Sequence, residues 1–299
     1  MNIAMIFPGQ GAQSVGMDRG LCDDEKSAYV KKELGEQFFT LLAEGPEDVL
    51  KKTRWSQLAI FLVSASLVDR LKETCFPSVV AGLSLGEYTA LYAASCLSFE
   101  ETFQLIKQRA SLMEAACEEN PGSMSAVIGM DPEEIARIIA PCEDVSIANY
   151  NTPLQTVLAG SFSGLKDAQA LLSAQGAKTI PLSVEGAFHS PFMEKAREGL
   201  IAYIDGLSFQ KPACRLFMNV PGQEVSSASL IKEYLIDQVT SPVRWTKIIQ
   251  SLKKEIHTWI EVGPGKKLSA MNGKMGVLRT YSVQEESQIG EVLEKVYVQ

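Results

Sequence analysis

Residues 82–86 read Gly-Leu-Ser-Leu-Gly and place a serine between two glycines. The apolar run 78–84 is typical of a buried strand, and the segment 85–95 has helical composition. A serine on a sharp turn from strand to helix projects its hydroxyl group outward, and the glycines leave room for the backbone to turn. Such a serine can attack a carbonyl carbon while nearby backbone amides hold the oxyanion. The pattern favours Ser84 as a nucleophile, and a plain tight turn stays open as the alternative.

A serine nucleophile needs a base, and the chain contains two histidines, His189 and His257. His189 lies between a strand and the start of a helix, at a junction between two predicted subdomains, where clefts commonly form. His257 leads into an apolar run and is typical of a histidine at a strand edge. With Asp237 before it, His257 would satisfy the order serine, acid, histidine of the α/β-hydrolases. We favour His189, and a hydrolase that uses His257 stays an alternative.

Composition and charge narrow the class of protein. The chain has 299 residues, of which 46% are hydrophobic and 21% charged, which is ordinary for a globular protein with a sizeable core. The net charge of −8 argues against a partner that is a nucleic acid, because such proteins usually carry a basic patch. The N-terminus lacks the basic region of a signal peptide, and no window of eighteen uncharged apolar residues is present. We expect a cytoplasmic protein without a membrane span.

The cysteines and the glycine-rich N-terminal segment give no sign of a metal or a cofactor. No CxxC pair and no cluster of histidine, cysteine and carboxylate residues has the spacing of metal ligands. The segment 9–16 lacks both the Walker A pattern and G-x-G-x-x-G, so we expect no nucleotide loop. Without heptads or an apolar surface stripe, we expect a monomer. Six reduced thiols, mostly buried, are expected at Cys22, Cys75, Cys96, Cys117, Cys142 and Cys214.

The first 120 residues alternate between strand and helix patterns, which points to a parallel α/β sheet. The last of the helices opens with a capping box, in which Ser98 is followed three residues later by Glu101. In chain order, the predicted elements are a strand at 3–7, a helix at 55–73, a strand at 78–84 and helices at 85–95 and 98–119.

The pattern changes at residue 123. Between 123 and 185 the predicted order is β-α-β-β-α-β, which is the ferredoxin-like arrangement. Asp131 is the expected N-cap of its first helix, and α/β elements resume after a helix that Ser190 should cap. The prediction is therefore a large α/β domain at 1–122 and 189–299, with an inserted ferredoxin-like α+β subdomain at 123–188.

Six segments occur here in the order that is seen in one enzyme family. They are FPGQGAQSVGM, GLSLGEYTAL, KQRASLME, GAFHSPFM, SPVRW and EVGPGKKL. With them the chain resembles the malonyl-CoA:acyl carrier protein transacylases from end to end. The resemblance implies an α/β-hydrolase-like large domain with a parallel sheet and the inserted subdomain. One position departs from the family, because Leu83 stands where histidine is usual, and its effect on the pocket stays open.

The resemblance also implies catalytic roles at matching positions. Ser84 would be the nucleophile and His189 the general base. The family orients its histidine by a backbone carbonyl, which falls at Gln238 here. The oxyanion would be held by the backbone amides of Gln10 and Leu85.

Two further positions would bind the acyl group. Arg109 would pair with the free carboxylate of a malonyl group, whereas the sequence alone favours a solvated charge on a helix. Phe188, beside the histidine, would narrow the acyl pocket, and a core aromatic residue is the equal alternative.

The implied activity is the transfer of a malonyl group from malonyl-CoA to the phosphopantetheine thiol of acyl carrier protein, through a malonyl-serine ester, in fatty acid biosynthesis. A discrete acyltransferase of a polyketide synthase, a serine esterase or thioesterase, and a non-catalytic scaffold that binds the carrier protein stay open. Acyl carrier proteins are acidic, so a local basic cluster should steer them. The candidates are Lys195 with Arg197, Lys253 with Lys254, and Lys266 with Lys267 and Lys274.

Overall fold

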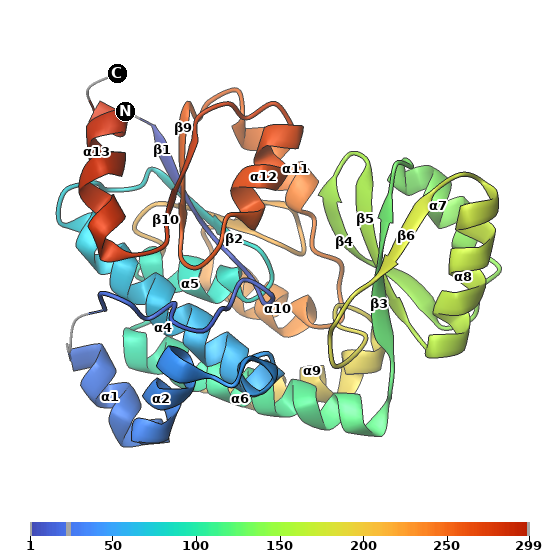
Figure 1. Ribbon diagram of the computed structural model, residues 1–299, viewed down its shortest axis with the longest axis horizontal. Helices are drawn as coiled ribbons and strands as arrows, with labels where there is room; N and C mark the ends of the chain where they lie inside the picture. The colour runs from blue at the N-terminus through green and yellow to red at the C-terminus, as the bar shows by residue number, and fades with distance from the viewer. Residues whose placement is uncertain (1, 22–24, 298–299) are drawn as a thin grey trace.

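The computed structural model describes residues 2–21 and 25–297 and has two lobes (Figure 1). The large lobe surrounds a six-stranded sheet, and the segment drawn in green and yellow forms the small lobe. Cys22 lies outside the described residues. The five other cysteines are free, but only Cys75 and Cys96 are buried and the remaining three are half-buried. The expectation of mostly buried thiols therefore holds only in part.

The large sheet has the strand order β10-β9-β1-β2-β7-β8, in which all neighbours are parallel except β7 and β8. Because parallel strands end at the same edge, the loops after β1 and β2 lie together, and ligands of such sheets bind at that edge. The strands are β1 (Ile3–Phe7), β2 (Val79–Gly82), β7 (Arg215–Met218), β8 (Gln223–Glu224), β9 (Thr258–Val262) and β10 (Thr280–Val283).

Helices cover both faces of this sheet. Strand β1 is fully buried, and its side chains alternate between two cores: Met5 and Phe7 face one, Ala4 and Ile6 the other. The first core is completed by α4 (Thr53–Lys72), α5 (Gly86–Ala93) and α6 (Phe99–Glu119), and the second by α11 (Trp245–Leu252) and α12 (Lys267–Lys274).

The small lobe is built on an antiparallel sheet with the order β4-β5-β3-β6. One face packs on α7 and α8 around Val127 and Leu158, and the other contributes Met124 and Ala159 to the core of the large lobe. This is the ferredoxin-like topology, so the predicted fold class is confirmed. The boundaries at 122/123 and 188/189 stay predictions. The elements are β3 (Ser123–Ile128), α7 (Pro132–Ile139), β4 (Val145–Thr152), β5 (Gln155–Gly160), α8 (Phe162–Ala174) and β6 (Lys178–Pro181).

Several helices of the large lobe have weaker sequence patterns. No element was predicted between residues 8 and 54, whereas the described part of this stretch contains the three short helices α1, α2 and α3. The helix expected from Ser190 begins instead as a 3₁₀ turn, and the Ser190 hydroxyl accepts the Phe192 amide at 3.3 Å. The remaining helices are α1 (Glu25–Leu34), α2 (Glu36–Glu44), α3 (Glu47–Leu50), the 3₁₀ turns Pro191–Met193 and Glu286–Gln288, α9 (Glu194–Asp205), α10 (Ala228–Gln238) and α13 (Ile289–Tyr297).

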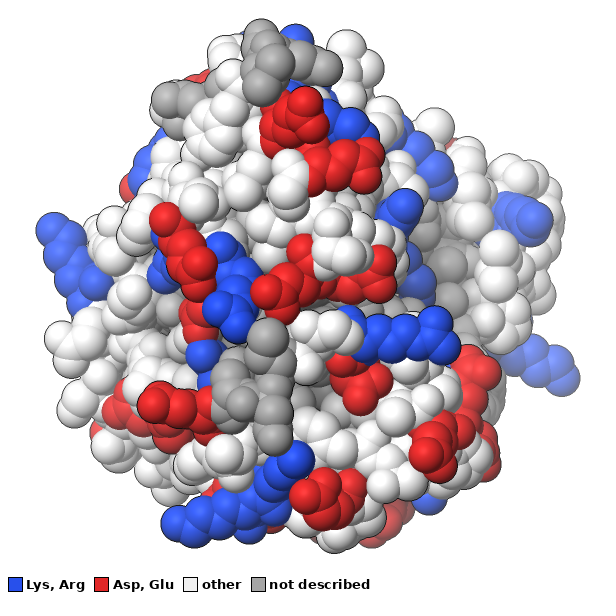
Figure 2. Space-filling view, turned by 60° about the vertical axis from the view of Figure 1, so that its left-hand side comes forward, with Lys and Arg blue, Asp and Glu red and all other residues white. Residues whose placement is uncertain are grey.

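Within residues 2–21 and 25–297, no helix is both long and apolar enough to cross a bilayer. On the face shown in Figure 2, acidic and basic side chains are interspersed. Opposite charges at this spacing largely cancel at a distance, so steering of a charged partner has to come from a local cluster.

Candidate active site

Ser84 lies on the turn between β2 and α5, with a left-handed φ of 53°. The two glycines of the motif make this turn possible. A Cβ atom on Gly82 would overlap the backbone of Gly86, and one on Gly86 would overlap the carbonyl oxygen of Phe7. The turn therefore needs glycine at both places, and it directs the serine to the edge where β1 and β2 end.

Asn219 holds the turn in place from the next strand. Its Oδ1 accepts the backbone amide of Ser84 at 2.7 Å, and its Nδ2 donates to the carbonyl oxygen of Gly82 at 2.7 Å. The side chain is fully buried, so these bonds satisfy backbone groups that water does not reach. Sequence reasoning missed this residue. Its one indication was a polar side chain directly after a buried strand, β7, at the edge where Ser84 lies.

His189 contacts both Ser84 and the backbone of α10. Its Nε2 lies 2.7 Å from the Ser84 hydroxyl oxygen, and its Nδ1 lies 2.8 Å from the carbonyl oxygen of Gln238. A carbonyl oxygen only accepts, so Nδ1 carries the proton and Nε2 is the acceptor for the serine proton. Burial, and then the charge of Arg109, lowers the pKa of His189 to about 4. The ring is therefore neutral at pH 7 and ready to act as a base.

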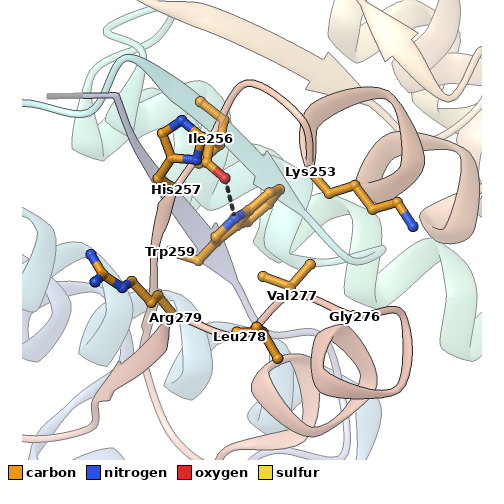
Figure 3. Close-up of a pocket in the computed structure, with 8 residues that line it drawn as sticks. All are labelled: Lys253, Ile256, His257, Trp259, Gly276, Val277, Leu278 and Arg279. Atoms are coloured by element: carbon orange, nitrogen blue, oxygen red, sulfur yellow. Dashed lines mark hydrogen bonds between the residues drawn. The ribbon is translucent and has the colours of Figure 1, made fainter.

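His257 lies at the opposite end of the sheet. It directly precedes β9, whereas Ser84 follows β2, and both strands run parallel to β1 between them. The five residues of β9 separate the two edges by roughly 16 Å. His257 and Trp259 are among the residues that line a cavity of about 490 Å³, and Figure 3 shows the two side chains near each other. Asp237, the other member of that alternative, pairs with Arg197 at 2.8 Å. The structure thus brings His189, and not His257, to Ser84.

The side chain of Arg109, on α6, reaches Ser84 as well. Its Nη2 donates to the Ser84 hydroxyl at 3.3 Å and to Oε1 of Gln238 at 3.2 Å, and its Nη1 donates to Oε1 of Gln57 at 2.7 Å. The guanidinium carbon lies 5.1 Å from the centre of the Tyr88 ring. Arg109 is 1% exposed, so the alternative of a solvated helix charge is wrong.

No carboxylate among the described residues forms an ion pair with Arg109, and its Nε atom has no hydrogen-bond partner among them. Burial lowers its pKa, which is the expected response of a cation taken out of water. A buried cation whose contacts are two amide oxygens, a hydroxyl group and an aromatic ring is unfavourable until an anion joins it. The site is therefore suited to a ligand that brings a negative charge next to Ser84.

Glu87 and the side chain of Gln238 complete the site. Glu87 is fully buried, and its two oxygens accept the Asn219 backbone amide and, at 2.8 Å, Nε2 of Gln238. That Nε2 also donates to the carbonyl oxygen of Ser84 at 3.0 Å. Burial raises the pKa of Glu87 to about 8. Only the backbone carbonyl of Gln238 was predicted to belong to the site. A charged residue inside the apolar segment 85–95 was the indication for Glu87.

Two backbone amides are the predicted donors to the oxyanion. Gln10 follows β1, and Leu85 follows Ser84 at the start of α5. In the part of the chain that the structure describes, neither amide has a hydrogen-bond acceptor. The Gln10 side chain donates to Thr53 at 3.1 Å, and Nζ of Lys267 donates to the next carbonyl, that of Gly11. Both contacts fix the loop, so two amides are free to hold an oxyanion, which stays a predicted role.

Phe188 and Leu83 belong to the hydrophobic cores. Phe188 is 6% exposed and contributes to the main core next to His189, a position that fits both a pocket wall and a core residue. Leu83 packs against the second core, on the other face of the sheet, and its amide donates to Phe7 at 3.1 Å. A leucine is therefore well suited to this position. Among residues 2–21 and 25–297, no group of three or more histidine, cysteine or acidic residues could hold a metal ion.

Comparisons with known proteins agree with the geometry of this site. The model of a family described as acyl transferase domain matches residues 4–291. The malonyl CoA-acyl carrier protein transacylase of Haemophilus influenzae is 34% identical, over 97% of this chain and 98% of the relative. A polyketide biosynthesis malonyl CoA-acyl carrier protein transacylase of Bacillus subtilis is 36% identical, over 90% of this chain and 95% of the relative.

Solved structures also resemble this protein in three dimensions. A type II PKS malonyl-transacylase, solved in complex with its acyl-carrier protein, is 31% identical with a TM-score of 0.94, over 99% of this chain and 100% of that one. MCAT from Streptococcus pneumoniae is 35% identical with a TM-score of 0.92, over 98% of this chain and 100% of that one.

Proposed function

This chain belongs to the acyl transferase domain family, and from that premise we propose both its reaction and the residues that perform it. It transfers a malonyl group from malonyl-CoA to the phosphopantetheine thiol of acyl carrier protein. The observation that carries this proposal is the buried cation of Arg109, which lies 3.3 Å from the Ser84 hydroxyl without a carboxylate of its own. A malonyl thioester supplies both the reacting carbonyl and the missing anion.

The first half of the reaction loads the serine. His189 takes the proton of Ser84 as the hydroxyl oxygen attacks the thioester carbon. The oxyanion that forms is held by the amides of Gln10 and Leu85. When the tetrahedral intermediate collapses, the bond from carbon to sulfur breaks, and the coenzyme A thiol leaves with the proton from His189. A malonyl ester on Ser84 remains.

The choice of acyl group depends on Arg109. A planar guanidinium binds a carboxylate by two parallel hydrogen bonds, which fixes the position of the acyl chain as well as its charge. An acetyl group lacks that carboxylate. Acetyl-CoA should therefore acylate the serine slowly, although its thioester is chemically equivalent.

The second half returns the acyl group to a thiol. The phosphopantetheine thiol of acyl carrier protein gives its proton to His189 and attacks the ester, so that Ser84 is released with the proton. Water has to be kept from the ester for transfer to compete with hydrolysis. The buried ring of Phe188 beside His189 narrows the pocket and supports that exclusion.

The wider role is also a proposal. We assign the enzyme to fatty acid biosynthesis, with a discrete acyltransferase of polyketide synthesis as the second role, because one relative that matches 90% of this chain is named for polyketide biosynthesis. A cytoplasmic location and a monomeric state stay predictions from the sequence.

Intact-protein mass spectrometry tests the reaction directly. Brief mixing with malonyl-CoA should add one malonyl group, acetyl-CoA should add little, and Ser84→Ala should remain unmodified. Acyl carrier protein should then remove the adduct. Hydrolysis of generic esters without a malonyl adduct would instead identify a hydrolase, and no reaction with any acyl donor would point to a scaffold.

A further inference from the structure

The side-chain amide of Gln238 is the link between Arg109 and the serine turn. Its oxygen accepts Nη2 of Arg109 at 3.2 Å, while its nitrogen donates to Glu87 at 2.8 Å and to the Ser84 carbonyl at 3.0 Å. Gln238 is fully buried, so no water satisfies these atoms. All of the strong hydrogen-bonding positions of the amide, except one lone pair of its oxygen, are therefore used within the site.

An amide of this kind has two orientations, which differ in whether oxygen or nitrogen faces the guanidinium. Three neighbours select the orientation that the structure has. The Ser84 carbonyl only accepts and the Arg109 guanidinium only donates, so the amide nitrogen faces Ser84 and the amide oxygen faces Arg109. Glu87 holds the same nitrogen through one carboxyl oxygen, while its other oxygen accepts the Asn219 backbone amide.

We propose that Glu87 is a positioning residue, which anchors the Gln238 amide and thereby holds Arg109 where it receives the carboxylate of the acyl group. This inference rests on the proposed function. Through Asn219 and the Ser84 carbonyl, Glu87 also supports the serine turn, which serves every acyl group alike. Through Gln238 it reaches the cation, which serves only an acyl group with a carboxylate, so its loss should lower malonyl acylation more than acetyl acylation.

The isosteric variant Glu87→Gln separates this role from simple packing. The introduced amide has to turn its oxygen to the Asn219 amide, because two N–H groups cannot face each other in a buried site. Its NH₂ group then faces the NH₂ group of Gln238, and a donor faces a donor. Turning the Gln238 amide over would set its oxygen against the Ser84 carbonyl and its NH₂ group against Arg109. The Gln238 side chain therefore has to move away from residue 87, and the guanidinium loses the fixed position of its acceptor.

The measurement is the acylation rate of Ser84 with malonyl-CoA and with acetyl-CoA, followed by intact mass. For E87Q we expect the malonyl rate to fall about tenfold or more, and the acetyl rate to fall by less than about threefold, since one hydrogen bond to a charged group is lost. The ratio of the two rates is the diagnostic quantity. A loss of stability alone lowers both rates together and leaves the ratio unchanged.

Glu261 offers a matched control. It lies in β9 and is also fully buried, and it accepts the backbone amides of Leu268 at 3.0 Å and Ser269 at 2.7 Å. Among the described residues, its hydrogen bonds go to Leu268 and Ser269, and none joins it to Gln238 or Arg109. E261Q should lower the melting temperature, as E87Q does, but should keep the wild-type ratio.

The outcomes are distinct. An unmodified wild-type enzyme would overturn the proposed function itself. A malonylated wild type with the same ratio in E87Q and E261Q would overturn only the role of Glu87. If E87Q does not melt cooperatively, Gln238→Met tests the same link, because it keeps the length of the side chain and removes the amide. It should lower the ratio in the same direction, and an unchanged ratio would overturn the proposal.

Discussion

Ser84 and His189 both have left-handed backbone conformations, with φ values of 53° and 59°, and their side chains meet at 2.7 Å. Among the described residues, only four non-glycine residues have positive φ. Two of those four are thus the reacting pair. Each such conformation costs roughly 1–2 kcal/mol, and it persists because Asn219 and the carbonyl of Gln238 hold the two residues.

The strain at Ser84 predicts an order of stability among two inactive variants. Both Ser84→Ala and Ser84→Gly remove the hydroxyl, but only glycine adopts the turn without strain. We expect S84G to have a free energy of unfolding higher than that of S84A by about 1 kcal/mol. Urea denaturation of the two proteins measures the difference. An S84A protein as stable as S84G, or more so, would contradict a strained turn.

Much of the fold was predictable because its elements have strong local patterns. The capping box at Ser98 and Glu101 forms as expected, with the Glu101 amide bound at 3.1 Å, and the strand 3–7 appears with those bounds. The helices between residues 25 and 50 were missed. They are short, and the structure holds them by packing against distant residues, as where Tyr29 stacks edge-on with Phe103 at 5.7 Å.

The residues of the site also fall into those that the sequence predicts and those that it does not. Ser84 and its glycines lie in one short stretch, whose geometry follows from the residues themselves. Asn219, Gln57 and Glu87 could not be placed, because their roles depend on pairings across 135, 52 and 132 positions respectively. A polar residue inside an apolar segment of the sequence indicates that its side chain will need a hydrogen-bond partner, but only the fold identifies that partner.

The pH dependence of acylation and of stability should reflect a buried histidine that stays neutral. Since the pKa of His189 is lowered to about 4, acylation at saturating malonyl-CoA should stay constant from pH 8 down to about 5, and fall only near 4. The unfolded chain binds this proton near pH 6.5, so stability falls as the pH drops from 6.5 towards 4. Stopped-flow acylation and melting curves across this range measure both. A rate that halves near pH 6.5 would mean that the histidine is solvated.

The contribution of Glu87 to stability should have the opposite dependence on pH. Its pKa is raised to about 8 by burial, so the folded protein retains a proton that the unfolded chain releases near pH 4.5. The stability from this group is present below pH 4.5 and is lost as the pH rises towards 8. The Glu87→Gln variant lacks this titration, and its unfolding free energy should fall less than that of the wild type between pH 5 and pH 8.

Arg109→Lys keeps a positive charge and removes the planar fork. We expect malonyl acylation to fall about a hundredfold, because two charge-assisted hydrogen bonds are lost, while acetyl acylation changes little. The same mass-spectrometric rates measure both, and Arg197→Lys serves as the control for an arginine outside the site, where it pairs with Asp237. If both rates fell equally, Arg109 would act on the serine and not on the acyl carboxylate.

Carrier-protein docking should depend on the basic cluster that lies on the same edge as Ser84. Lys195 and Arg197 already pair with Glu119, Glu194 and Asp237, which cancels most of their charge. Lys254 precedes β9, at the edge away from the serine, whereas Lys266 follows β9, at the edge where Ser84 lies.

Lys266→Glu should therefore raise the KM for acyl carrier protein several-fold and leave the rate of acylation by malonyl-CoA unchanged, because reversing a charge that faces an acidic partner slows association. Lys254→Glu makes the same charge change on the far edge and should leave both quantities unaltered. Steady-state transfer at two ionic strengths measures the effect, which salt should diminish. An equal rise in KM for both variants would show that the partner responds to net charge and not to a docking surface beside the serine.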